Sequence, residues 1–207
     1  MSVPTLQVLL KAAFDHEISN IHTALPGHIV KYDPVLQKAD VKPDIKKKYY
    51  NGDAQDMPII SNVPIVFPRS SKAFIKFPLE PNDGLLLIFS ERSLERWLSL
   101  GGTVEPGNNR KFDISDCIAI PGAFSFAQPI PDSSNNMVIK YNNGSYVINE
   151  DGKIAAGNSS EELLDLIVTL LDAIKSITYG GNALDPVGVA QIDTLKTRFD
   201  TIKGTLS

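Results

Sequence analysis

The chain has 207 residues, of which 43% are hydrophobic and 21% charged, and its formal net charge is −4. These proportions exclude a chain that is disordered throughout, and a negative charge without a basic stripe argues against nucleic-acid binding. The only basic run, at 46–48 beside Tyr49 and Tyr50, is interpreted as a solvated loop. A single cysteine, Cys117, excludes an intrachain disulfide and fits assembly in a reducing cytoplasm.

A separate N-terminal helix is predicted within residues 1–20. Pro4 suits a first helical position, and apolar residues then recur at helical spacing. Lys11 and Asp15 interrupt the apolar stretch, so we expect no signal peptide, and no segment is apolar over the length of a bilayer span. The apolar stripe consists of Leu6, Leu9, Leu10, Ala13, Phe14 and Ile18.

Short β segments follow from His28 onward. Prolines punctuate them, and proline favours strand ends, edges and turns because it has no amide donor. A short helix over 90–100, with Leu94, Trp97 and Leu98 on one face, interrupts the series. Many short strands with this punctuation predict a small barrel over 21–124. The predicted strands are 28–32, 38–41, 63–67, 72–77, 84–89 and 116–120.

A linker is predicted over 125–136, which is rich in proline, serine and asparagine. Three short strands are expected within 137–157, separated by Asn-Gly and Asp-Gly turns. A sheet this small has little core of its own, so it needs a partner, such as other copies of the chain. The predicted interface residues of this segment are Met137, Ile139, Tyr141, Tyr146, Ile148 and Ile154.

Residues 158–207 are predicted to form a helical hairpin. Ser159 and Glu162 match a capping box. A glycine pair at 180–181 breaks the first helix, and Asp185-Pro186 starts the second. The apolar faces exceed what one hairpin can cover, which argues for oligomerisation. The predicted interface residues of the helices are Leu163, Ile167, Leu170, Ile174, Ile177, Ile192, Leu195, Phe199 and Ile202.

The number of chains is not fixed by this pattern. Isoleucine at the a-like positions and leucine at the d-like positions of a simple parallel coil favour two strands, so a trimer must be argued from elsewhere.

Reactive side chains are sparse and do not form a recognisable site. Cys117 lies in an apolar strand and is expected to be buried. His16, His22 and His28 are six residues apart, a spacing that suits neither a helical nor a strand metal pair. The chain has no phosphate loop and no recognisable Ser-His-Asp order, and its acidic residues are interpreted as solvated. We therefore expect no enzyme activity, no cofactor and no metal.

A series of segments over about half of the chain resembles a phage protein family. Taken in chain order, these segments resemble the N-terminal OB-fold domain of a family of central spikes from contractile phage tails. The spikes of this family carry no lysozyme domain. The Asn62–Pro68 segment carries the strongest similarity. The segments are 26–34, 39–43, 62–68, 77–79, 81–93 with Trp97, 110–116 and 120–122.

The resemblance implies a mainly β protein with added helices. Its expected parts are an OB-fold collar at 21–124, a short trimeric intertwined β-helix or prism stem at 137–157, and the C-terminal α-hairpin. It implies a homotrimer attached to the baseplate hub at the end of the tail tube, which pierces the host outer membrane transiently. The location would be the virion, after assembly in the host cytoplasm.

Several departures from the family leave alternatives open. Residues 123–136 are too few for a lysozyme domain, and no histidine follows His28 to hold the iron of longer spikes. The spike is either blunt and helix-capped or carries a separate tip protein. The N-terminal helix docks on the hub or on a neighbouring subunit. The main rival is an OB-fold binding module for an oligosaccharide or single-stranded nucleic acid, and a cell-wall hydrolase is a second rival.

Overall fold

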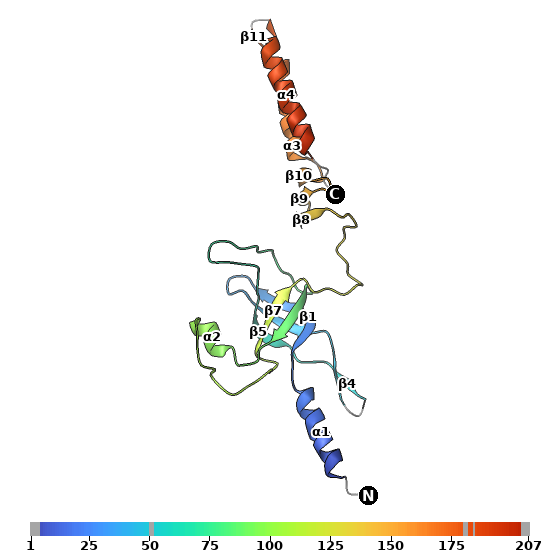
Figure 1. Ribbon diagram of the computed structural model, residues 1–207, viewed down its shortest axis with the longest axis vertical. Coiled ribbons are helices and arrows are strands. Elements are labelled where there is room, and N and C mark those ends of the chain that lie inside the picture. The colour runs from blue at the N-terminus through green and yellow to red at the C-terminus, as the bar shows by residue number, and fades with distance from the viewer. Residues whose placement is uncertain (1–4, 50–51, 180–181, 184, 204–207) are drawn as a thin grey trace. The chain divides into compact units, whose positions relative to one another are not determined.

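The computed structural model describes residues 5–49, 52–179, 182–183 and 185–203. The fold is mixed α/β, and the chain divides into two compact units, Met1–Pro129 and Ile130–Ser207 (Figure 1). The division after Pro129 falls within the segment 125–136 that was predicted as a linker.

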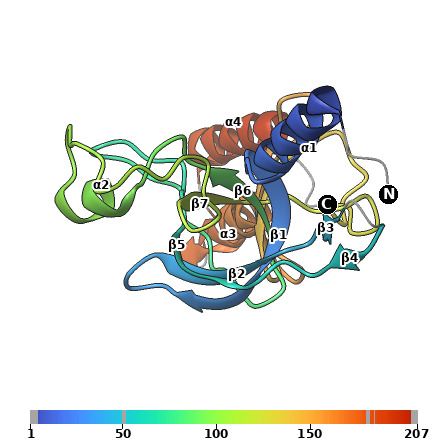
Figure 2. The same cartoon turned by 90° about the horizontal axis from the view of Figure 1, so that it is seen from below.

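The first unit is built on a five-stranded antiparallel sheet of order β5-β2-β1-β6-β7 (Figure 2). The unit also contains two helices and a small two-stranded ribbon of β3 and β4. Its elements are α1 (Leu6–Ser19), β1 (Ala24–Asp33), β2 (Lys38–Pro43), β3 (Lys47–Lys48), β4 (Ala54–Gln55), β5 (Ile60–Pro64), β6 (Gly84–Phe89), α2 (Glu95–Leu100) and β7 (Cys117–Pro121).

The sheet curls until its two edge strands meet. Directly after β5, Ile65 forms a parallel bridge with Ala119 of β7. The Val66 amide donates to the Ala119 carbonyl at 2.9 Å. Register irregularities in the β1–β2 and β2–β5 ladders accompany the curl, because a bulge increases local twist. The result is a curled half-barrel, compatible with the predicted barrel domain.

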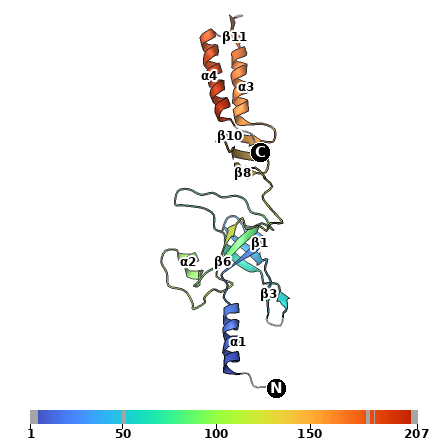
Figure 3. The same ribbon diagram turned by 45° about the vertical axis from the view of Figure 1, so that its right-hand side comes forward.

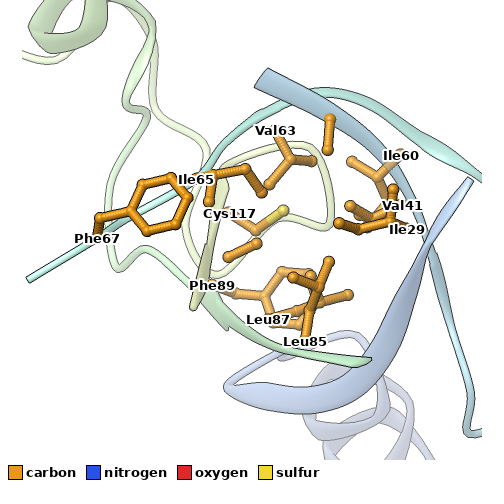
Figure 4. Close-up of a cluster of buried hydrophobic side chains, with 12 residues drawn as sticks. Ile29, Val41, Ile60, Val63, Ile65, Phe67, Leu85, Leu87, Phe89 and Cys117 are labelled. Atoms are coloured by element: carbon orange, nitrogen blue, oxygen red, sulfur yellow. The ribbon is translucent and has the colours of Figure 1, made fainter. Parts of the chain in front are cut away.

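Alternation along the strands places one apolar face inside this curl (Figure 4). Leu85 and Leu87 of β6 are fully buried, whereas Leu86 between them faces outward. Gly27 lies where a Cβ atom would come within 2.8 Å of the Lys42 carbonyl oxygen, so glycine lets β1 and β2 approach closely. The buried cluster consists of Ile29, Ala39, Val41, Ile60, Val63, Ile65, Phe67, Leu85, Leu87, Phe89, Cys117 and Ala119.

Two predictions for this unit are wrong. Residues 72–77 form no strand, and the only pairing there is an isolated bridge between Arg69 and Phe74. The Ser70 hydroxyl accepts the Ala73 amide at 3.1 Å, which closes a local turn in place of a ladder. The helix predicted over 90–100 begins only at Glu95.

The second unit contains a three-stranded antiparallel sheet of order β10-β9-β8, a two-stranded ribbon of β11 and β12, and two helices. The strands and helices predicted here are present, and α3 and α4 run side by side in opposite directions (Figure 3). Its elements are β8 (Met137–Tyr141), β9 (Gly144–Ile148), β10 (Ile154–Asn158), α3 (Leu163–Ser176), β11 (Thr178–Tyr179), β12 (Asn182–Ala183) and α4 (Pro186–Ile202).

The sequence predicts the N-cap of α4 correctly and the N-cap of α3 incorrectly. Asp185 caps α4 as expected, because its carboxylate accepts the Val187 amide at 2.8 Å. The capping box predicted for α3 is wrong: Glu162 is itself the N-cap and accepts the Asp165 amide at 2.8 Å. The predicted helix break at 180–181 lies outside the described residues.

Candidate subunit interface

The three-stranded sheet gathers all six predicted stem residues on one face. Residues alternate between faces along a strand, and Met137, Ile139 and Tyr141 therefore share one face of β8. The register places Ile148 opposite Met137 and Tyr146 opposite Ile139. It also places Ile154 opposite Ile148, which completes the set.

This shared face is the more exposed face of the sheet. Met137, Ile139 and Tyr141 are each about 60% exposed, whereas Val147 and Ala155 on the opposite face are fully buried. Within the described residues β8 pairs only with β9, so its outer edge can accept a further strand. The sheet therefore offers both an apolar face and a pairing edge.

Ion pairs fix how α3 and α4 meet. Asp172 and Lys196 lie 2.6 Å apart, and the pairing raises the pKa of Lys196. Two further ion pairs of the described residues join these helices, Lys175–Asp193 and Asp165–Lys203. From one pair to the next, the residue number rises along α3 by as much as it falls toward the start of α4, so the three pairs fit one antiparallel register.

This register leaves an apolar stripe of α3 exposed. Leu163, Leu166 and Leu170 are each about half exposed. Their spacing of three and four residues is that of a coiled-coil seam. Ile177, which is 58% exposed, lies just past the end of α3 in extended backbone. The sequence prediction missed Leu166, although its position between Leu163 and Leu170 on the same face was the available signal.

The remaining predicted helix residues divide into two groups. Ile174, Leu195 and Ile202 are exposed, between 37% and 49%. Ile167, Ile192 and Phe199 are half-buried. The exposed group is available to another chain.

The histidines and the cysteine that were considered as reactive groups do not come together in one site. The His22 ring lies 5.3 Å from the Phe89 ring, tilted by 44°, and burial lowers the pKa of His22. His28 Nδ1 lies 2.6 Å from Asp44 Oδ1. Cys117 is 2% exposed, as predicted, and burial raises its pKa to about 12.

The described residues contain no cluster of three metal-ligating side chains. Within the same ranges, no helix has both the length and the apolar character to cross a bilayer.

The basic run makes contacts within its own unit. Lys46 pairs with Asp56 at 3.0 Å, and hydrogen bonds from Lys46 and Lys42 lower the pKa of Asp56. Lys47 donates to Asn20 at 3.2 Å and lies 5.9 Å from the Tyr49 ring centre. The run therefore lies at the surface as predicted, but Lys47 and Lys48 form strand β3 of the small ribbon and not a loop.

Comparison with known proteins bears on the first unit. Residues 25–122 match the family model of the phage protein Gp138 N-terminal domain. The matched segment begins in β1 and ends directly after β7, so it spans the curled sheet. No curated protein matches the chain. The Gp138 match supports a phage structural protein associated with the virion.

Proposed function

We propose that the chain is the trimeric central spike of a contractile phage tail. The observation that carries this proposal is the single exposed apolar face on the small sheet, in a chain whose first unit matches a phage protein domain. The spike would cap the tube and hub, and sheath contraction would push it through the host outer membrane. This role needs a rigid assembly and no catalysis.

The first unit would form the collar as an OB-fold. Support comes from the strand order, in which β1 pairs with both β2 and β6, and from the parallel contact of Ile65 with Ala119. A five-stranded Greek-key barrel with partial closure has these properties. The collar would seat on the hub protein at the end of the tail tube.

The second unit would form the stem and its cap. Three copies of the β8–β10 sheet would bury their Ile139 faces against one another, and each β8 edge would pair with a different strand of the next copy, which removes exposed strand edges. The exposed stripe of α3 would continue this contact as a three-stranded helical seam, with α4 outside it.

Gold-labelled antibodies raised against the purified protein test this proposal on isolated tails. We expect label at the baseplate, at the end of the tube, in extended tails, and at the protruding tube tip in contracted tails. A matched control uses tails from a phage in which the gene is disrupted. Label along the sheath, or on the head, would contradict the proposal.

A further inference from the structure

An open apolar groove of about 1250 Å³ lies on the first unit. The 64–76 segment forms one wall, α2 contributes Trp97 and Leu98, and the sheet contributes Ile88 and Ile118. Phe74 and Trp97 are 74% and 48% exposed, so the described residues leave much of both side chains uncovered. Large contiguous apolar patches of this kind mark interaction sites.

The charges along the groove have one sign. Arg69, Lys72 and Lys76 line it, and none of the described lining residues carries a carboxylate. Lys76 donates to the Pro34 carbonyl at 3.3 Å, while Arg69 and Lys72 form no ion pair within the described part of the chain. The groove therefore suits an apolar segment that carries carboxylates.

Helix α1 is apolar and carries carboxylates, and the described residues leave it uncovered. Every residue from 5 to 20 is exposed, including Leu6 at 72%, Phe14 at 65% and Ile18 at 64%. Asp15 and Glu17 lie between Phe14 and Ile18. An isolated helix of this length is marginal in water, so α1 needs a surface to pack on.

We propose that α1 of one copy occupies the groove of a neighbouring copy. The apolar side of α1 would cover Phe74 and Trp97, and Asp15 and Glu17 would face Arg69 and Lys72. Each copy then gives one helix and receives one, and such a head-to-tail contact closes into a ring. The inference rests on the proposed trimer and adds the contact that holds its collars together.

Disulfide cross-linking tests this contact in the full chain. Phe14→Cys combined with Phe74→Cys places one thiol on α1 and one in the groove. The native Cys117 adds no background, because it is buried and its pKa is about 12. After mild oxidation we expect covalent dimers and trimers on a non-reducing gel, whereas each single variant should remain uncross-linked.

Other patterns would overturn the inference. Cross-linking of Phe14→Cys alone would mean that α1 helices pair with one another, and a cross-linked monomer would place α1 in its own groove. Absence of cross-links in a protein that light scattering shows to be trimeric would refute the helix exchange and leave the spike proposal standing. A monomer by light scattering would refute both.

A charge exchange provides the second measurement. Asp15→Lys with Glu17→Lys should slow cross-linking on the order of tenfold, because like charges then meet at the groove. Arg69→Glu with Lys72→Glu should have the same effect, and the four changes together should restore the rate. Failure of the combined variant to recover, with helix content unchanged, would contradict the proposed orientation of α1.

Discussion

The Glu162 carboxylate accepts a hydrogen bond from the Ala156 amide at 3.0 Å while it caps α3. One buried side chain therefore fixes the last strand of the small sheet to the first turn of the helix. Glu162 also bridges to Gly157, the residue after Ala156. The apolar sheet face and the α3 stripe are thus held together as parts of one body, as a continuous intersubunit seam requires.

This junction predicts that Gly157→Ala is strongly destabilising. A Cβ atom at Gly157 would lie 2.1 Å from the Glu161 carbonyl oxygen, so the connection to α3 would have to move. We expect a loss of about 2–4 kcal/mol in the free energy of unfolding, measured in urea. Gly144→Ala is the matched control, since its Cβ atom would meet nothing closer than 3.6 Å. Equal losses in both variants would contradict the steric argument.

Leu170→Lys should dissociate the assembly. Leu170 is 59% exposed on the α3 stripe, and in a trimer three lysines would be forced together there. We expect the concentration for half-dissociation to rise about a hundredfold by analytical ultracentrifugation. Gln191→Lys, on an exposed position of α4, serves as the control and should leave the assembly intact. An unchanged assembly in Leu170→Lys would move the interface away from this stripe.

Asp116→Ala should unfold the edge of the curled sheet. Asp116 is 4% exposed and accepts bonds from Arg110 Nε at 2.9 Å and from the Leu94 amide at 3.0 Å. Its loss leaves the partly buried Leu94 amide and the half-exposed Arg110 guanidinium without their acceptor, so we expect a cost of about 1–3 kcal/mol in thermal or urea unfolding. Asp151→Ala removes an exposed ion pair with Lys153 and should cause little change. Comparable effects would argue that the Asp116 network is dispensable.

Sequence patterns predicted the core better than the surfaces. The short apolar run from Gly84 to Phe89 predicted β6, and the structure buries Leu85 and Leu87 while Leu86 between them is more exposed. The same signal failed at 72–77, where a short apolar run forms no strand and the Ser70 hydroxyl closes a local turn. A segment becomes a strand only where a neighbouring strand is available to pair with it, and the local pattern of apolar residues does not show this.

The sequence predicted which residues form the candidate interface, but only in part which of their side chains are exposed. Met137, Ile139 and Ile148 were all predicted as interface residues, and the observed register places Ile148 opposite Met137, on the same face of the sheet. Which side of α3 faces α4 could not be predicted, because it depends on ion pairs between helices distant in sequence. Leu166 was therefore missed, and the half-buried Ile167 was grouped with the exposed residues.

Alkaline pH should weaken the native fold through Cys117. Burial raises its pKa from 9.0 to about 12, so the unfolded thiol ionises first. The contribution to stability is complete below pH 9 and is lost as pH rises toward 12. At about pH 10.5 we expect roughly 2 kcal/mol more destabilisation, relative to neutral pH, in the native protein than in Cys117→Ala. Parallel pH profiles of the two proteins would contradict this.

Light scattering of the full chain in solution measures whether the protein is a trimer. We expect three times the chain mass of 22.6 kDa, and we expect this mass to persist on dilution. A stable, folded monomer of 22.6 kDa would contradict the proposed trimer. The exposed faces of the β8–β10 sheet and α3 would then need another partner, and a monomeric OB-fold binding module would become the better account.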